Sequence, residues 1–304
     1  MAERGRGREG EAVSGPPRSI RRPAWLLVAG LVGAIVVITL AAGGGNGFPP
    51  SGQVYTVAVE PGSPDRLLLG TRDGLFRSTD GGKSWEPFGG DPLQSEDVLG
   101  VVFSPQNSLL IYAAGPEIGV LKSEDGGNSW AETATGLPTR DVRALALNPA
   151  SPNLLFAFVA GSGLFRTSDG GASWLPVPGN LDREDVSALA ASPDGLTLYA
   201  SGLGLGVLKS GDGGRNWRPT RRQPARDVAH LALQPEEPDT VLAATARGVY
   251  RTTDAGESWR LSSRGIGDPR VIAVALDPLG PDTAYAATDQ ALFKSGDGGE
   301  SWSP

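Results

Sequence analysis

The chain has 304 residues, including 44 glycines, 25 prolines, one histidine and no cysteine. The lack of cysteine excludes disulfides, thiolate metal sites and a cysteine nucleophile, and the single histidine excludes sites that need two imidazoles. Because glycine and proline interrupt regular elements, their abundance predicts many tight turns between short strands rather than a helical protein. The 39% of hydrophobic residues is enough for a core at this length.

Residues 1–22 form a basic tail with six arginines and three glutamates, and residues 23–42 form an uncharged, apolar stretch. A helix over residues 25–42 would rise about 27 Å, close to the thickness of the hydrocarbon core of a bilayer. The positive charges precede this stretch, which predicts a cytoplasmic tail, a single-pass transmembrane signal-anchor helix and an extracytoplasmic remainder at the cell membrane. A cleaved signal peptide is the alternative, but the apolar run exceeds the usual length of roughly 7–15 residues.

A Gly/Pro-rich linker is predicted over residues 43–52, ahead of the remaining domain. Residues 43–304 carry 21 basic and 31 acidic side chains, a net charge of −10. Nucleic-acid binding depends on neutralising phosphates, so an acidic domain outside the cytoplasm is a poor candidate for it. The expected partners are the membrane, through the N-terminal helix, and a protein or glycan ligand, but no nucleic acid.

One motif recurs six times after the linker, with the pattern [ST]-x-D-x-G-x-[SN]-W. Its aspartates are 42–45 residues apart, a regularity that indicates a repeat architecture. The aspartates are Asp80, Asp125, Asp169, Asp212, Asp254 and Asp297. The tryptophans that close the six copies are Trp85, Trp130, Trp174, Trp217, Trp259 and Trp302.

An aliphatic run that ends in proline recurs in the same phase, at residues 53–61, 97–105, 141–149, 185–193, 227–235 and 270–278. Its nearly continuous apolar character predicts a strand that is buried on both faces. Two further short apolar runs follow in each repeat, and a fourth strand is expected to start at the tryptophan. Four strands in about 43 residues predict an all-β, six-bladed β-propeller over residues 53–304. Only two residues follow Trp302, so the sixth blade is expected to have a very short outer strand.

The segment Asp80 to Trp85 and its five copies resemble the Asp-box, also called the bacterial neuraminidase repeat. This motif occurs in sialidases, sortilin-type receptors, certain glycoside hydrolases and the photosystem II stability/assembly factor family. The string GLFRSTDGGKSW at residues 74–85 is most similar to the last of these groups. The resemblance covers residues 53–304 and implies the fold, but it says little about activity.

The residues of the motif predict a structural role. An aspartate followed by glycine in a hairpin accepts backbone N–H bonds, and the tryptophan is expected to fill the space between neighbouring blades. One carboxylate per turn falls short of the six to eight oxygens that calcium takes, so neither a metal site nor a cofactor is predicted. The Arg or Lys before each motif is expected to cover apolar blade surface with its stem.

Candidate ligand-binding residues lie where the inner strands begin, because that end of the central channel should be lined by loops. They are Asp97, Asp141, Asp185, Asp227, Arg140, Arg226 and Arg270. Three interpretations are open: two carboxylates, with Asp141 and Asp185 as catalytic candidates, cleave a glycoside; the aspartates hold a cation; or they cap turns and pair with neighbouring arginines.

Sialidases resemble one another in an Arg-Ile-Pro segment and a Tyr–Glu nucleophile pair, and this chain has no such segment. Its five tyrosines all fall in predicted strands at apolar positions, and His230 replaces a small residue in a strand, as a core histidine does. We therefore expect a non-catalytic, membrane-anchored platform for a protein or envelope partner. The alternative is a sialidase-like glycoside hydrolase or a carbohydrate-binding propeller.

Overall fold

A computed structural model of the chain describes residues 53–181 and 185–304. The basic tail, the transmembrane helix and the linker predicted over residues 1–52 lie outside the described residues. Within the described ranges, no helix is long and apolar enough to cross a membrane.

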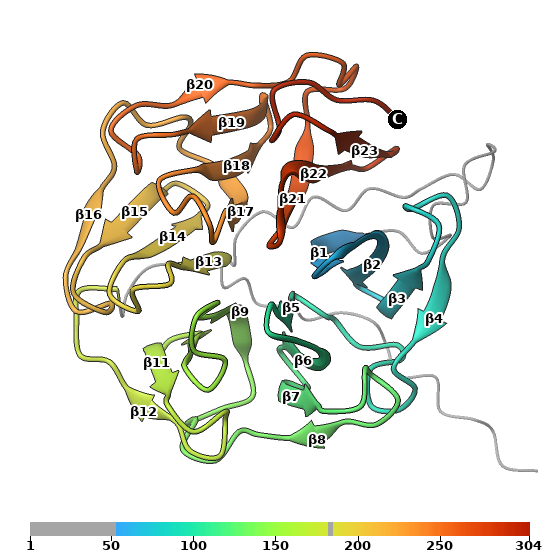
Figure 1. The fold of residues 1–304 in the computed structure, drawn as a ribbon. Helices are drawn as coiled ribbons and strands as arrows, with labels where there is room; N and C mark the ends of the chain where they lie inside the picture. Colours follow the sequence, from blue (N-terminus) through green and yellow to red (C-terminus); the bar gives the residue numbers. More distant parts are fainter. Residues whose placement is uncertain (1–52, 182–184) are drawn as a thin grey trace, which may run out of the picture. The chain divides into compact units, whose positions relative to one another are not determined.

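The described residues form six antiparallel sheets arranged as the blades of a ring around a central channel, which confirms the predicted six-bladed propeller (Figure 1). Blades 1 to 3 contain β1 (Val54–Glu60), β2 (Ser63–Thr71), β3 (Gly74–Ser78), β4 (Glu86–Phe88), β5 (Gly100–Ser104), β6 (Asn107–Gly115), β7 (Gly119–Ser123), β8 (Ala131–Glu132), β9 (Val142–Leu147), β10 (Leu155–Val159), β11 (Gly163–Thr167) and β12 (Leu175–Pro176). Blades 4 to 6 contain β13 (Ala188–Ala191), β14 (Leu198–Gly202), β15 (Gly206–Ser210), β16 (Trp217–Pro219), β17 (Val228–Leu233), β18 (Val241–Thr245), β19 (Gly248–Thr252), β20 (Arg260–Leu261), β21 (Val271–Asp277), β22 (Gly280–Thr288) and β23 (Leu292–Ser295).

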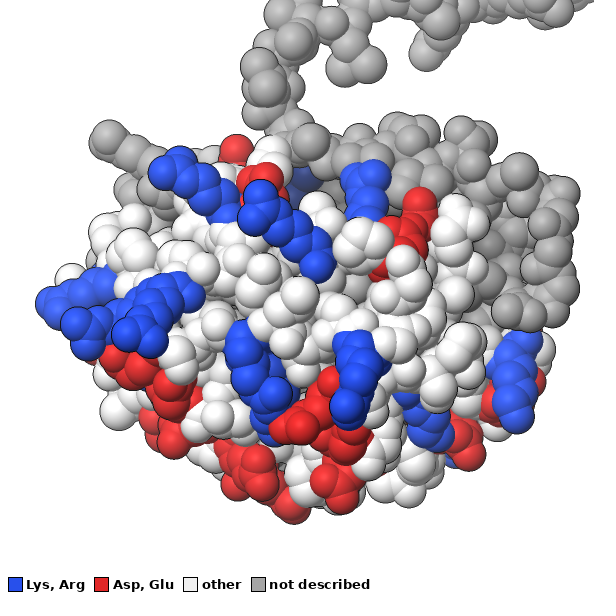
Figure 2. All heavy atoms as spheres, turned by 90° about the horizontal axis from the view of Figure 1, so that it is seen from above, with Lys and Arg blue, Asp and Glu red and all other residues white. Residues whose placement is uncertain are grey.

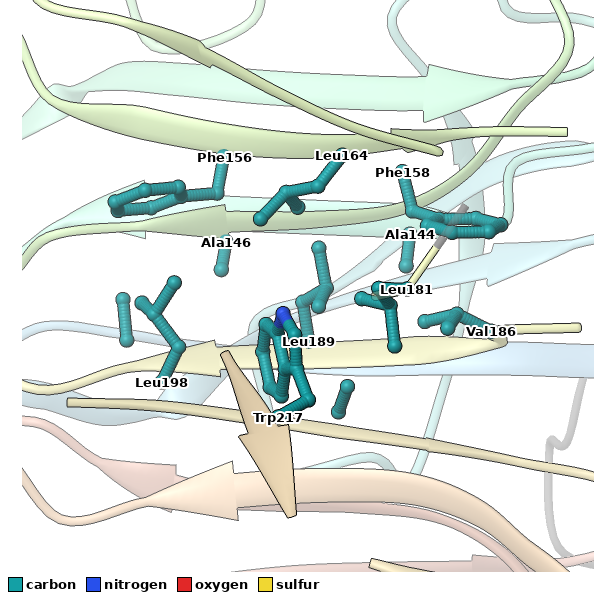
Figure 3. Packing of buried hydrophobic residues seen from close by; sticks show 12 residues of the cluster. Ala144, Ala146, Phe156, Phe158, Leu164, Leu181, Val186, Leu189, Leu198 and Trp217 are labelled. Atoms are coloured by element: carbon teal, nitrogen blue, oxygen red, sulfur yellow. The ribbon is translucent and has the colours of Figure 1, made fainter. Parts of the chain in front are cut away.

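The core of the ring lies between the blades. Each of six apolar clusters joins two neighbouring sheets and includes the tryptophan that closes one repeat. Between blades 3 and 4, Trp217 packs with Phe156, Leu164 and Leu189 (Figure 3). Alanines such as Ala146 on the inner strand leave room for these larger side chains. The continuous apolar runs therefore bury both faces of each sheet against neighbours, as their pattern predicts.

Successive blades alternate between two kinds. In blades 2, 4 and 6 a tyrosine on the second strand lies opposite a lysine on the third, and we call these the tyrosine–lysine blades: Tyr112 and Lys122, Tyr199 and Lys209, Tyr285 and Lys294. In blades 1, 3 and 5 an apolar residue lies opposite an arginine, and we call these the arginine blades: Leu68 and Arg77, Phe156 and Arg166, Leu242 and Arg251. The ring thus repeats every two blades.

Among residues 53–181 and 185–304, no strand is shared between the first and last blades. Blade 6 has three full strands, and its fourth is reduced to a bridge between Ser303 and Lys294. Closure comes from side chains instead: Tyr285 and Ala275 pack with Val57 and Leu69 of blade 1. Lys294 adds an ion pair of 2.8 Å with Asp65 across the same junction.

Candidate functional site

The repeated motif forms six nearly identical turns between the third and fourth strands. In the first, Ser78 Oγ accepts the N–H of Gly82, and Asp80 Oδ1 accepts the N–H of Ser84 at 2.9 Å. The same two bonds recur in the other five turns. Each carboxylate is thereby saturated by its own loop, so the turn organises the backbone and leaves little capacity for a metal ion.

These hydrogen bonds stabilise the ionised carboxylate and therefore lower its pKa. Bonds from Ser84 lower the pKa of Asp80 to about 2, and the equivalent Ser or Asn lowers the pKa values of Asp125, Asp169, Asp212 and Asp254 to about 2 as well. The pKa of Asp297 is also lowered, first by Ser301. All six turns therefore stay negatively charged at any pH near neutrality.

Acidic and basic side chains lie close to one another at the edge of the ring. In the side view of Figure 2, acidic groups gather mostly toward one rim, with basic groups beside them. Some of the basic residues before the motifs take part: Arg77 pairs with Glu86, and Arg251 pairs with Glu300. Arg77 also lies over the ring of Phe88, 4.4 Å from its centroid. These contacts give the basic residues local partners rather than a common ligand.

The inner strands of all six blades line a cavity of about 170 Å³ in the central channel. Most of its lining is aliphatic, and its polar side chains are Thr56, Ser187 and His230. We call the end of the channel at which the inner strands begin the mouth. There, connectors between blades meet the loops between second and third strands, as in the bonds from Val98 N–H to the Thr71 carbonyl and from Gly206 N–H to the Arg226 carbonyl.

Two glycines allow this close approach of loop and connector. A Cβ on Gly115 would lie 1.9 Å from the carbonyl oxygen of Asp97, and one on Gly202 would lie 1.9 Å from that of Asp185. Both contacts are far below van der Waals distance, so any side chain at these glycines would displace the connector. The backbone that carries two of the candidate aspartates is therefore fixed by packing against glycine.

A bulge near the start of the inner strand directs an additional side chain to the mouth. The strand register slips between Val54 and Thr56 in blade 1, and the same slip occurs in blades 3, 5 and 6. Bulges interrupt the alternation of side chains along a strand and re-aim the extra residue. Tyr55 is thereby partly exposed, with its hydroxyl 3.4 Å from Asp97 Oδ1. The expectation that every tyrosine occupies an apolar strand position is thus wrong for Tyr55.

The carboxyl of Asp97 lies in a half-buried group that includes Tyr55, Arg72, Asp73 and Arg143. Burial is the main cause that raises the pKa of Asp97, while Tyr55 and the two arginines oppose the rise. Burial, and then the charge of Asp97, raise the pKa of Tyr55 to about 12. A phenol with this pKa stays protonated and donates a hydrogen bond, so it is poorly suited to act as a nucleophile.

Asp141, one of the two catalytic candidates, directly precedes β9 and is bound by Arg143 of that strand. Both carboxylate oxygens accept from Arg143, with Nη2 to Oδ2 at 2.9 Å. This bidentate geometry fixes the orientation of the carboxylate against Arg143. Asp185, the other candidate, is exposed and has no side-chain partner among the described residues. The structure does not join the two carboxylates through a hydrogen bond.

The other candidates divide into occupied and unpaired groups. Asp227 Oδ1 accepts the N–H of Gly204, and Arg140 forms an exposed ion pair of 2.7 Å with Glu132. Arg226 and Arg270 form no ion pair with any residue in the described ranges, and Arg226 is exposed. Within the described parts of the mouth, Asp185 and these two arginines thus have no ion-pair partner.

His230 lies deep in the channel wall, where its Nε2 is 3.1 Å from Thr56 Oγ1 across the channel. Its Nδ1 is buried without a hydrogen-bond partner in the described part of the chain. Burial lowers the pKa of His230 to about 4, so the ring is neutral at physiological pH. Only one of the two ring nitrogens of His230 therefore has a side-chain partner, because the channel is lined mainly by aliphatic side chains and backbone.

Sequence reasoning missed Tyr55, Arg143 and Ser187 as mouth residues. All three hold the third position of the aliphatic run, where the six repeats have Tyr55, Leu99, Arg143, Ser187, Ala229 and Ile272. The preceding position is valine in all six repeats, so variation directly after it is the signal that could have revealed exposure. The described residues contain no cluster of three or more acidic or histidine side chains fit to hold a metal ion.

The fold and its six turns define an Asp-box β-propeller with a polar channel mouth. The family model described as Photosynthesis system II assembly factor YCF48 matches residues 51–304, and the chain belongs to this family. A solved structure of YCF48 bound to D1 peptide is similar, with 18% identity and a TM-score of 0.55 over 84% of this chain and 83% of that one.

Glycoside hydrolases are also similar. The GH74 xyloglucanase from Xanthomonas campestris has 20% identity and a TM-score of 0.58 over 81% of this chain and 45% of its own. An oligoxyloglucan-reducing end-specific xyloglucanase of Emericella nidulans is 36% identical over 87 residues, which are 27% of this chain and 11% of the enzyme. The chain thus spans about a tenth of the curated relative, and the likeness to solved structures shows the fold alone.

Proposed function

We propose that the chain is a membrane-anchored, extracytoplasmic and non-catalytic platform that binds a segment of a protein partner at the mouth of its propeller. Membership of the assembly-factor family supports this function, as does a relative that binds a D1 peptide. The span predicted over residues 23–42 supplies the anchor. The partner is expected to present carboxylates, because Arg226 and Arg270, which form no ion pair within the described residues, would attract them.

The observation that carries the proposal is the state of the carboxylates at the mouth. A glycosidase needs one carboxylic acid and one carboxylate on opposite sides of the scissile bond. Here Asp141 is held by Arg143 on both oxygens, and the raised pKa of Asp97 belongs to a group that bonds Tyr55. These side chains are hydrogen-bonded to one another, whereas Arg226 and Arg270 form no ion pair within the described residues. The mouth thus favours binding of an anionic segment over hydrolysis.

Binding is tested with the full chain in nanodiscs and a fluorescent peptide that has three glutamates and a free C-terminal carboxylate. The double change Arg226→Gln and Arg270→Gln is expected to weaken binding about tenfold, and the wild-type affinity is expected to fall as salt rises. The matched control is Arg215→Gln, an exposed arginine in the fourth Asp-box turn. Equal binding by the double variant and wild type would refute the proposed site.

The local similarity to a xyloglucanase favours a second candidate function, hydrolysis or binding of a β-glucan. It is tested by incubating the same preparation with xyloglucan oligosaccharides and measuring new reducing ends. Hydrolysis that is lost in both Asp141→Asn and Asp185→Asn would replace the binding proposal with an enzymatic one.

A further inference from the structure

The channel has a second end, opposite the mouth, which we call the base. There each inner strand ends in proline, and a hairpin leads from it to the second strand of the same blade. These base hairpins are residues 60–66, 104–109, 148–154, 192–197, 234–240 and 277–283. In every blade the Asp-box turn is hydrogen-bonded to the base hairpin, as in the bond from Gly81 N–H to the Asp65 carbonyl. Both kinds of turn therefore lie at the base.

The base end of the channel is apolar. Each inner strand contributes one apolar side chain to the cavity lining, two positions before its proline: Val59, Phe103, Leu147, Ala191, Leu233 and Leu276. Four of the prolines, all half-buried, also line the cavity: Pro105, Pro149, Pro235 and Pro278. Phe103 and Leu233 are only half-buried, so part of this apolar surface can be reached from solvent. The base thus offers an apolar side chain a place to insert.

The surroundings of this opening are acidic. The only basic residue of the base hairpins is Arg66, which pairs with Glu60 at 3.0 Å. Six acidic residues of these hairpins are exposed: Asp65, Asp194, Glu236, Glu237, Asp239 and Asp282. The Asp-box aspartates beside them have low pKa values and are ionised at neutral pH. Figure 2 shows the acidic side chains concentrated toward one rim of the ring.

Three exposed leucines add apolar surface among these charges. Leu109, Leu196 and Leu279 belong to the base hairpins of blades 2, 4 and 6, and each is between 51% and 55% exposed. Large apolar side chains exposed near an apolar opening are typical of a surface that binds another molecule.

We propose that the base is a second docking surface, which takes a basic segment of a protein partner and receives one of its apolar side chains in the channel opening. Lysines and arginines of the segment would face the exposed carboxylates of the base hairpins, whereas an anionic segment would be repelled. The apolar side chain gains free energy by leaving water and serves as the anchor.

The base is separate from the mouth. The inner strand β1 has seven residues, so the two ends of the channel are about 23 Å apart. This distance exceeds the Debye length of about 8 Å at physiological ionic strength, so charges at one end act weakly on the other. The inference therefore does not depend on the function proposed for the mouth.

The first test uses the full chain in nanodiscs of zwitterionic lipid and a fluorescent peptide, KKGFGKK, blocked at both ends so that it carries no carboxylate. Empty nanodiscs measure binding to lipid alone. The peptide is expected to bind, and its affinity is expected to fall as salt rises. The peptide KKGAGKK should bind about tenfold more weakly, because it lacks the apolar anchor. This comparison needs no protein variant.

The second test places the site at the base. The double change Glu236→Lys and Asp282→Lys, at exposed positions of blades 5 and 6, should weaken binding of KKGFGKK at least tenfold. The matched control is Asp91→Lys with Glu117→Lys, which changes the net charge equally at exposed positions on the mouth side. It should weaken binding less than twofold. The glutamate peptide used for the mouth should bind the base variant at least as well as the wild type.

Three results would overturn the proposal. The first is a lack of binding of KKGFGKK to the wild type, and the second is equal affinity for KKGFGKK and KKGAGKK. The third is an equal loss in the base and mouth double variants, which would show attraction to net charge rather than to the base. None of these results bears on binding of the glutamate peptide, so the two proposals fail separately.

Discussion

The hydroxyl of Tyr285 in the last blade donates a hydrogen bond of 2.7 Å to the carbonyl oxygen of Pro64 in the first. Tyr112 donates to Gly170 and Tyr199 to Ala255, both in the Asp-box turn of the next blade, whereas Pro64 lies in β2, so every tyrosine–lysine blade contacts the arginine blade that follows it. The lysines reinforce two of these contacts: Lys209 bonds the Ala255 carbonyl, and Lys294 bonds Asp65. Closure of the ring thus uses an interaction that already joins two interior junctions.

Tyr285→Phe is expected to lower the free energy of unfolding by about 1 kcal/mol, because the half-buried Pro64 carbonyl loses its donor. Urea unfolding of the purified protein measures the change. Tyr250→Phe is the matched control, since Tyr250 is a half-buried tyrosine of blade 5 with no side-chain hydrogen bond in the described structure. Equal losses in the two variants would show that the hydroxyl of Tyr285 contributes nothing specific.

Ala255→Gly is expected to stabilise the protein by roughly 0.5–1 kcal/mol. Five Asp-box turns have glycine after the aspartate, but the fifth has Ala255, which holds a left-handed backbone with φ of 55°. That conformation costs a residue with a Cβ about 1–2 kcal/mol, and glycine avoids this cost. Glycine also has more conformational freedom in the unfolded chain, which offsets part of the gain in stability. Thermal or urea unfolding measures the gain.

The reciprocal change, Gly213→Ala, completes the test. Gly213 has φ of 72°, and the nearest atom to an added Cβ lies 3.9 Å away, so only the backbone conformation is challenged. This variant should lose a similar amount of stability. A stabilised Gly213→Ala protein would contradict the conformational explanation for both sites.

His230→Ala is expected to flatten the dependence of stability on pH between about 6.5 and 4. The unfolded histidine takes up a proton below its ordinary pKa of 6.5, whereas the folded one does so only below about 4. As pH falls through this window, protonation favours the unfolded chain, so the wild type loses on the order of 3 kcal/mol from this group alone. Below pH 4 both states carry the proton and this loss ends.

Alanine is a matched replacement, because Ala144, Ala188 and Ala273 occupy the same position in other blades. Urea unfolding at pH 7, 5.5 and 4 measures the difference between variant and wild type, and the carboxylates common to both proteins cancel. Parallel curves for the two proteins over this range would rule out a buried, neutral His230.

The six blades could be predicted from sequence because each repeat contains its own signals. The Asp-box fixes one turn through local bonds such as Ser84 to Asp80, and proline ends each inner strand. Because the bonds of each turn are local, the residues that form them recur in the sequence at a nearly constant spacing. The number of repeats therefore equals the number of blades. The very short outer strand of blade 6 followed from the two residues after Trp302, and the structure reduces it to the bridge at Ser303.

The candidate site was predictable only as a region. The aspartates before the inner strands lie near the mouth, but a bulge of one residue decides that Tyr55 and Arg143 join them. The bulge depends on how the first strand pairs with a second strand some fifteen residues later. The pattern of apolar residues within the first strand does not predict this pairing. Likewise, the pairing of Asp141 with Arg143 depends on which way that bulged side chain turns.

The alternation of blades also constrains how such a ring can change in evolution. Each tyrosine–lysine blade holds an arginine blade after it, and the first and last blades obey the same rule because the ring is closed. Only an even number of blades lets the two kinds alternate around a circle. Gain or loss of a single blade would set two blades of one kind side by side, whereas gain or loss of a two-blade unit would keep the alternation. The alternation therefore makes the two-blade pair, rather than the single blade, the unit by which such a ring can grow or shrink unchanged in pattern.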